Sequence, residues 1–210
     1  MRKSVLLMIT AVAMFVGACS DPAADKSKAV TGEATKVASP AANAVGQKYL
    51  ITPQTSKVEF TGSKVTGSHN GSFGDFSGSI DYAGTPEQSH VNFTIKTDSL
   101  TTDTPDLTKH LKTADFFDVA KFPEATFVST SIKPGGEKGA SHTVTGNLTL
   151  HGVTKAVTFP ATISVTPETA TIDSTFSINR KDFGINYAGQ ADNLIRDDVV
   201  LKLTIRASKS

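Results

Sequence analysis

The sequence predicts an all-β protein, an antiparallel eight-stranded barrel with one short helix and a structureless segment in front of it. Three observations predict this fold class. Apolar and polar residues alternate through about eight segments after Tyr49, turns rich in Gly and Pro separate these segments, and the residues before Gln47 show no periodicity. A sheet with one apolar face must close on itself or pack against a second sheet, so a β-sandwich is the competing architecture.

The first 18 residues have the organisation of a secretory signal peptide. Arg2 and Lys3 precede an apolar run over residues 5–16, which is shorter than the about 20 residues of a membrane span. The run ends in Val16-Gly17-Ala18-Cys19, which resembles a bacterial lipobox. We therefore expect residues 1–18 to be removed and Cys19 to carry fatty acyl chains such as palmitate. An ordinary signal peptide that happens to contain a cysteine is the alternative.

Acylation would also explain the cysteine count. Cys19 is the only cysteine of the chain, and a free thiol is a liability in an oxidising compartment. The expected location is the periplasmic side of the cell envelope, lipid-anchored. Ser20 after the cysteine favours the outer membrane.

Residues 19–47 are expected to form a flexible tether. They are mostly Ala, Ser, Thr, Lys, Asp and Pro, without an aromatic residue before position 47. Such a composition cannot bury enough apolar surface to offset the entropy of ordering.

The barrel domain is expected over residues 48–208. Strands are predicted at residues 56–61, 72–80, 91–97, 125–132, 142–150, 157–165, 172–178 and 199–205, where apolar side chains recur every second position. A helix is predicted at residues 104–113, with Pro105 near its start. Eight meandering strands fit an up-and-down barrel that can enclose one small ligand.

Three ordered motifs in this domain resemble those of a known family. They are Lys109–Asp118 with the following Lys121-Phe122-Pro123, the segment Gly146–Lys155, and Ile178–Ile185. Their pattern is similar to that of the YceI-like lipid- and polyisoprenoid-binding proteins. Thr55-Ser56 stands where that family often has His-Ser, so no role of that histidine is transferred. The resemblance implies a lipocalin-like barrel, mostly extracytoplasmic, that binds long isoprenoid or fatty-acyl molecules in an internal channel.

The residues themselves agree with an apolar ligand. The chain has 12 Phe, 3 Tyr and no Trp, and phenylalanines on apolar strand faces can line a channel that needs few hydrogen bonds. A dry, fully packed core is the alternative. The expected ligand-binding residues are Phe60, Phe76, Phe93, Phe116, Phe117, Phe127, Leu148, Phe159, Phe176, Arg180, Asp182 and Phe183.

Two of these residues are charged. Arg180 and Asp182 are expected either to meet a polar head group at the channel mouth or to form a structural salt bridge. The segment 104–122 is expected to close one end of the barrel and to gate the ligand, or else to act as a simple plug.

Other function classes find little support. The five histidines have no metal-ligand spacing, and no cysteine can join them. No nucleophile elbow, phosphate loop or redox motif is present, and no basic cluster suggests nucleic-acid binding. We therefore expect no metal, no cofactor other than a bound isoprenoid or quinone-type lipid, and no enzyme activity. The predicted function is a carrier for a polyisoprenoid, an isoprenoid quinone or a fatty-acyl lipid. The alternatives are an enzyme acting on such a lipid and a ligand-free structural lipoprotein, and homodimerisation is left open.

Overall fold

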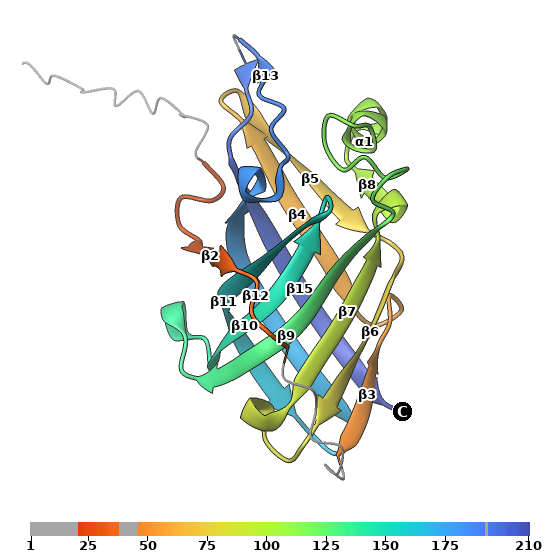
Figure 1. Cartoon of the computed structure of the whole chain (residues 1–210), viewed down its shortest axis with the longest axis vertical. Coiled ribbons are helices and arrows are strands. Elements are labelled where there is room, and N and C mark those ends of the chain that lie inside the picture. Colours follow the sequence, from red (N-terminus) through yellow and green to blue (C-terminus); the bar gives the residue numbers. More distant parts are fainter. Residues whose placement is uncertain (1–20, 38–45, 192) are drawn as a thin grey trace, which may run out of the picture.

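The apolar faces of the alternating strands meet inside a closed antiparallel barrel (Figure 1). This computed structural model describes residues 21–37, 46–191 and 193–210. The predicted signal peptide, residues 1–18, and Cys19 lie outside the described residues. Among the described residues, no helix is long and apolar enough to cross a membrane.

Eight strands make the ring, and each pairs antiparallel with the next. In ring order they are β3 (Gln47–Ile51), β6 (Phe76–Tyr82), β7 (His90–Lys96), β9 (Glu124–Pro134), β10 (His142–Leu150), β11 (Val153–Val165), β12 (Thr169–Asn179) and β15 (Asp198–Lys209). The ring closes where β15 pairs with β3, Ser208 opposite Leu50. The predicted eight-stranded barrel is confirmed, and the sandwich is not what forms.

Three further strands extend the wall at one end. They are β4 (Lys57–Lys64), which pairs with β15, then β5 (Gly67–Phe73) on β4, and β8 (Leu100–Thr102) on β5. The strand predicted at residues 72–80 is in fact two strands, because the wall bends at Gly74 and Asp75. Backbone hydrogen bonds from Gly74 N to Ser99 O and from Lys96 N to Asp75 O fix this bend.

The predicted helix is confirmed as α1 (Pro105–Leu111), shorter than expected at both ends. Proline suits the first turn because its missing N–H would have no helical partner there. The chain then turns back, with Phe117 N donating to Leu111 O and Asp118 N to Thr113 O. Figure 1 places α1 at the same end of the barrel as the small hairpin of β13 (Gly189–Gln190) and β14 (Asn193–Leu194). The described residues also form four short 3₁₀ turns: Pro86–Gln88, Thr97–Ser99, Glu137–Gly139 and Arg180–Phe183.

The N-terminal strap, residues 21–37, corrects the tether prediction over this stretch. Its strand β1 (Ser27–Lys28) runs parallel to β12, and its strand β2 (Val30–Glu33) runs antiparallel to β11. The pairing of β11 with β12 covers only residues 162–165 and 170–173. Beyond those residues the two strands separate, and the strap fills the seam between them.

The composition of the strap concealed this role. The side chains of Ser27 and Ala29 are buried, whereas Val30 is 70% exposed. A segment that packs against the core of a neighbouring domain needs only small side chains and backbone hydrogen bonds. The apolar content of the segment itself therefore does not reveal that it is ordered. Side-chain contacts also fix the strap, among them Lys28 to Asp198, Thr31 to Asp182 and Asp21 to Arg196.

Candidate functional site

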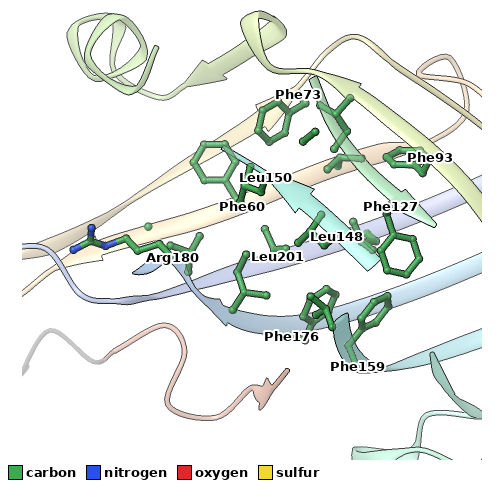
Figure 2. Close-up of a pocket in the computed structure, with 18 of the residues that line it drawn as sticks. Phe60, Phe73, Phe93, Phe127, Leu148, Leu150, Phe159, Phe176, Arg180 and Leu201 are labelled. Atoms are coloured by element: carbon green, nitrogen blue, oxygen red, sulfur yellow. The ribbon is translucent and has the colours of Figure 1, made fainter. Parts of the chain in front are cut away.

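An apolar cavity of about 250 Å³ runs through the barrel interior (Figure 2). Its wall comes from the inward faces of the strands and, at one end, from α1 and the loop after it. The lining is almost entirely Phe, Leu, Ile, Val and Ala, with Ser63, Lys64, His69 and Arg180 as the polar exceptions. Such a site can solvate a hydrocarbon chain and offers it little hydrogen bonding.

Several phenylalanine rings lie across glycines of the neighbouring strand. Phe60 faces Gly71, where an added Cβ would come within 2.2 Å of the ring. A Cβ on Gly146 would come within 2.3 Å of the Phe127 ring. The glycines therefore let these large rings lie against the wall, and this leaves the centre of the barrel open.

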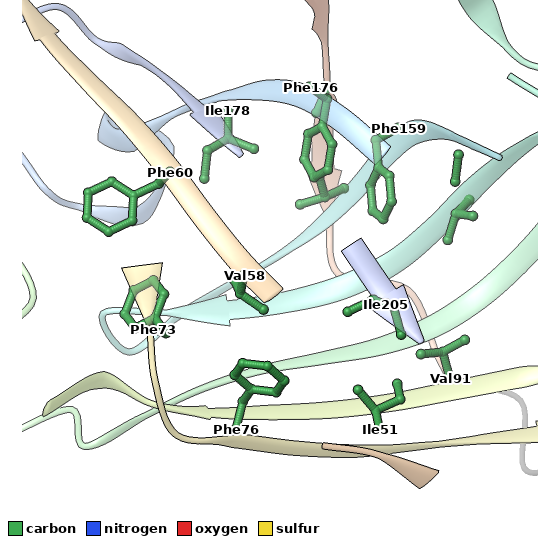
Figure 3. Close-up of a cluster of buried hydrophobic side chains, with 14 of the residues drawn as sticks. Ile51, Val58, Phe60, Phe73, Phe76, Val91, Phe159, Phe176, Ile178 and Ile205 are labelled. Atoms are coloured by element: carbon green, nitrogen blue, oxygen red, sulfur yellow. The ribbon is translucent and has the colours of Figure 1, made fainter. Parts of the chain in front are cut away.

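Aromatic and aliphatic side chains together form the buried hydrophobic cluster of the interior (Figure 3). Phe159 and Phe176 stack with ring centroids 4.2 Å apart and an interplanar angle of 8°. These residues come from β11 and β12, next to the point where the two strands separate. The stack therefore keeps β11 and β12 in contact, from inside the barrel, next to the point where their backbone pairing ends.

Most of the predicted ligand-binding residues lie on the cavity wall. They are Phe60, Phe93, Phe116, Phe117, Phe127, Leu148, Phe159, Phe176 and Arg180. Phe76, Asp182 and Phe183 lie off it. Phe76 is buried and packs against Phe93, with ring centroids 5.4 Å apart, and Phe183 is fully buried in the core. Strand alternation identifies a side chain that points inward, but it does not say whether that side chain reaches the cavity.

Arg180 and Asp182 do not form the salt bridge that was one of the two alternatives for them. Arg180 Nη2 lies 3.4 Å from Asp197 Oδ1, and Asp182 Oδ2 accepts a 2.6 Å hydrogen bond from Thr31 Oγ1. Asp182 is therefore a structural contact of the N-terminal strap.

Arg180 itself is only 4% exposed. Its guanidinium donates to three backbone carbonyls, those of Ile185, Ile195 and Arg196. Burial lowers the pKa of this side chain, and the nearby carboxylate of Asp197 opposes that effect. Figure 2 shows its nitrogens directed away from the labelled phenylalanines. Arg180 thus presents its aliphatic carbons to the cavity and uses its charge to hold the loop between β12 and β15.

Two polar lining residues of the cavity, Lys64 at the end of β4 and His69 in β5, lie at the end that carries α1, which we call the mouth. His69 lies there with its side chain 38% exposed, and its Nδ1 is 2.9 Å from Asp103 Oδ1. The pKa of Asp103 is lowered, first by a hydrogen bond from the backbone N–H of Asn70 and then by His69. This pair joins the hairpin of β4 and β5 to the loop that leads into α1.

The segment after β8 covers part of the mouth, as predicted. Leu107 and Leu111 of α1 and the adjacent Phe116 and Phe117 all line the cavity. Phe117 packs on Phe73 at a centroid distance of 5.7 Å, and Phe116 packs on Tyr187 at 5.3 Å. Phe116 and Phe117 thus connect the barrel wall at Phe73 to the loop that contains Tyr187. Gating stays a prediction.

The sequence patterns missed several lining residues, and some of them left a signal. Leu201 and Leu203 alternate in the last strand, and Leu107 and Leu111 share one face of α1. Ile185 and Ile195 come from irregular chain, where no periodicity could have identified them. Within the residues that the structure describes, no three His, Cys, Asp or Glu side chains come together as metal ligands.

Comparisons with known proteins agree with this geometry. The YceI-like domain matches residues 49–207. A UPF0312 protein of Pseudomonas putida strain W619 is 42% identical over 137 residues, which is 62% of this chain and 70% of that protein. A UPF0312 protein of Pseudomonas syringae pv. tomato is 40% identical over 140 residues, 63% and 72% of the two chains.

Solved structures share the barrel. BcnA of Burkholderia cenocepacia superposes with a TM-score of 0.63 at 26% identity, over 75% of this chain and 99% of that one. The YCEI protein of Campylobacter jejuni gives 0.59 at 26% identity, over 67% and 84%. A polyisoprenoid binding domain from Saccharophagus degradans gives 0.62 at 17% identity, over 79% and 99%, and its likeness concerns the fold alone.

Proposed function

Because the chain belongs to the YceI-like family, we propose that it carries a long-chain apolar lipid inside its barrel. The observation that carries the proposal is the apolar cavity, whose wall holds nine of the predicted ligand-binding residues. The name of the Saccharophagus degradans domain, which has the same fold, favours a polyisoprenoid. An isoprenoid quinone or a fatty-acyl lipid has the same chemistry along its chain.

The cavity supports binding by burial of hydrocarbon. Each CH₂ group moved from water into such a wall stabilises the complex by about 0.8 kcal/mol. Polar contacts are available only near the mouth, where Lys64 and His69 lie. The head group is therefore expected at the mouth and the chain below it.

Mass spectrometry of lipid extracted from natively purified protein tests this function. We expect one class of long-chain lipid at about one molecule per barrel. Leu148→Trp, in the middle of the cavity, should abolish it, whereas Leu50→Trp on the outer wall should not. Protein that contains no lipid and binds none in detergent would refute the carrier. If the extracted lipid were chemically converted during incubation with the protein, the enzyme alternative would replace it.

We also propose that Cys19 is acylated and anchors the chain on the periplasmic side of a membrane. The lipobox-like sequence and the absence of any other cysteine support this. Wild-type protein should fractionate with membranes, and Cys19→Ser protein should be released. A Cys19→Ser variant that stays membrane-bound and is processed normally would refute the anchor.

A further inference from the structure

Two exposed apolar side chains lie next to each other at the rim of the cavity mouth. Val65 is in the turn between β4 and β5, Leu194 is in β14, and each is 50% exposed. Val65 N donates to Leu194 O at 3.2 Å, which joins the two hairpin tips. Figure 1 shows the tips side by side at one extreme of the molecule. We call Val65 and Leu194 the rim pair.

The other exposed large apolar residues of the described chain are scattered. They are Val30 and Val37 on the strap and Leu50 on β3, which lies toward the opposite end of the barrel. A single exposed apolar residue is ordinary on a protein surface. An adjacent pair at the opening of an apolar cavity is different, because it extends the apolar lining to the outside.

The N-terminal strap begins at the same end. Asp21 forms a 3.2 Å ion pair with Arg196, and Arg196 N donates to Ser63 O beside the rim pair. Cys19 precedes Asp21 by two residues, a span of at most about 7 Å. An acyl anchor on Cys19 would therefore hold the mouth, and not the far end, near the membrane.

The charges at this end are largely balanced. Lys112 pairs with Asp98 and Lys109 with Asp106, while Asp103 and Asp115 contact His69 and His110. Lys64, next to Val65, adds a further cation, so charges of both signs are interspersed around α1 and the β4–β5 hairpin. Contact with a membrane at this end would depend on the apolar side chains and only weakly on salt.

We propose that the rim pair is a docking tip that inserts into a phospholipid bilayer surface and connects the cavity mouth directly to the membrane. This inference rests on the proposed lipid binding and names the partner of that site. An apolar ligand could then pass between bilayer and cavity without crossing water. The anchor sets the orientation, and the rim pair makes the contact.

Site-specific labelling measures this orientation. Full-length Val65→Cys, Leu194→Cys and Leu50→Cys proteins are treated with a nitrobenzoxadiazole thiol reagent in vesicles of phosphatidylethanolamine and phosphatidylglycerol. Some of the lipids carry a nitroxide quencher. We expect strong quenching at positions 65 and 194 and little at position 50. Equal quenching at all three positions, or none at 65 and 194, would overturn the proposal.

Wild-type protein serves as a separate control for the anchor. Its only cysteine is Cys19, so an acylated chain takes up no reagent. Labelled wild type would refute the anchor and with it the orientation proposed here. Failure of the carrier function would show differently, as absence of ligand binding in detergent, where no bilayer is present.

A transfer experiment tests the function of the tip. The probe is fluorescent geranylgeraniol in the same vesicles, and its uptake rate is compared between two double variants. Val65→Asp with Leu194→Asp should slow uptake about tenfold, since two apolar contacts with the bilayer are lost. Val30→Asp with Leu50→Asp, the matched control, should remain within about twofold of wild type.

The same variants are measured in detergent for affinity and melting temperature. None of the four positions lines the cavity, so both quantities should stay close to wild type. Equal uptake by the rim variant and the control would refute the docking tip. A rim variant that loses affinity in detergent at an unchanged melting temperature would also refute it, because the rim would then belong to the ligand site.

Discussion

Replacing Gly146 with alanine tests whether the glycines keep the cavity open. A Cβ at this position would lie 2.3 Å from Phe127 Cζ and 2.7 Å from the carbonyl oxygen of Val128. The ring tip must therefore move by about 1 Å or more, into the cavity, and the backbone of β9 must shift as well. We expect Gly146→Ala to lower the free energy of unfolding by about 1–3 kcal/mol and to reduce the amount of bound lipid.

Two other glycines provide matched controls. A Cβ on Gly62, which lines the cavity, or on Gly32 of the strap would meet no atom within 4 Å. Alanine at these positions should be neutral or stabilise the fold by up to about 1 kcal/mol, because it restricts the unfolded chain. Urea unfolding and lipid stoichiometry are measured for all three variants. If Gly146→Ala has the same free energy of unfolding as Gly32→Ala and keeps its lipid, the Phe127 ring does not lie against Gly146 as we infer.

Three other variants test the site. Arg180→Gln should destabilise the fold by about 2–4 kcal/mol in urea unfolding, since buried carbonyls lose their donors; a loss below about 0.5 kcal/mol would contradict this. Phe116→Ala with Phe117→Ala should release bound lipid faster at a nearly unchanged melting temperature if the segment is a gate. A large loss of stability with unchanged release would leave only a plug. Asp103 has a lowered pKa in the folded protein, so its stabilising contribution is present above its ordinary pKa of 3.8 and is lost as the pH falls below that value. In acid titrations followed by circular dichroism, Asp103→Asn should flatten this part of the stability profile, and an unchanged profile would count against the role of the His69–Asp103 pair.

The barrel was predictable because its signal is local and repeated. In β10, Val144, Gly146 and Leu148 alternate with polar residues, and the observed strand has the predicted bounds. A sheet with such strands has few ways to hide its apolar face. The bend at Gly74 was not predictable, since it depends on backbone hydrogen bonds with Lys96 at the end of β7 and with Ser99 in the 3₁₀ turn that follows.

The site was predictable only in outline. Phe60, Phe76 and Phe176 all follow strand alternation, but Phe76 packs against Phe93 and does not line the cavity. The partner of Arg180 was not predictable, because Asp197 is 17 residues away in a loop without periodicity. The strap was missed for a related reason: its stability comes from strands more than 100 residues further along the chain.

That separation has a consequence for the order of folding. Thr31 pairs opposite Val157, and Ser27 opposite Phe176, so the first described segment cannot find its partners until most of the chain is present. Contacts between such distant residues form slowly, because a long loop must close first. We expect the strap to remain unpaired until β11 and β12 have formed and to dock late. During that interval the seam between β11 and β12 would be uncovered, and, if Cys19 is the anchor that we propose, the residues next to it would stay accessible to the enzymes that acylate it.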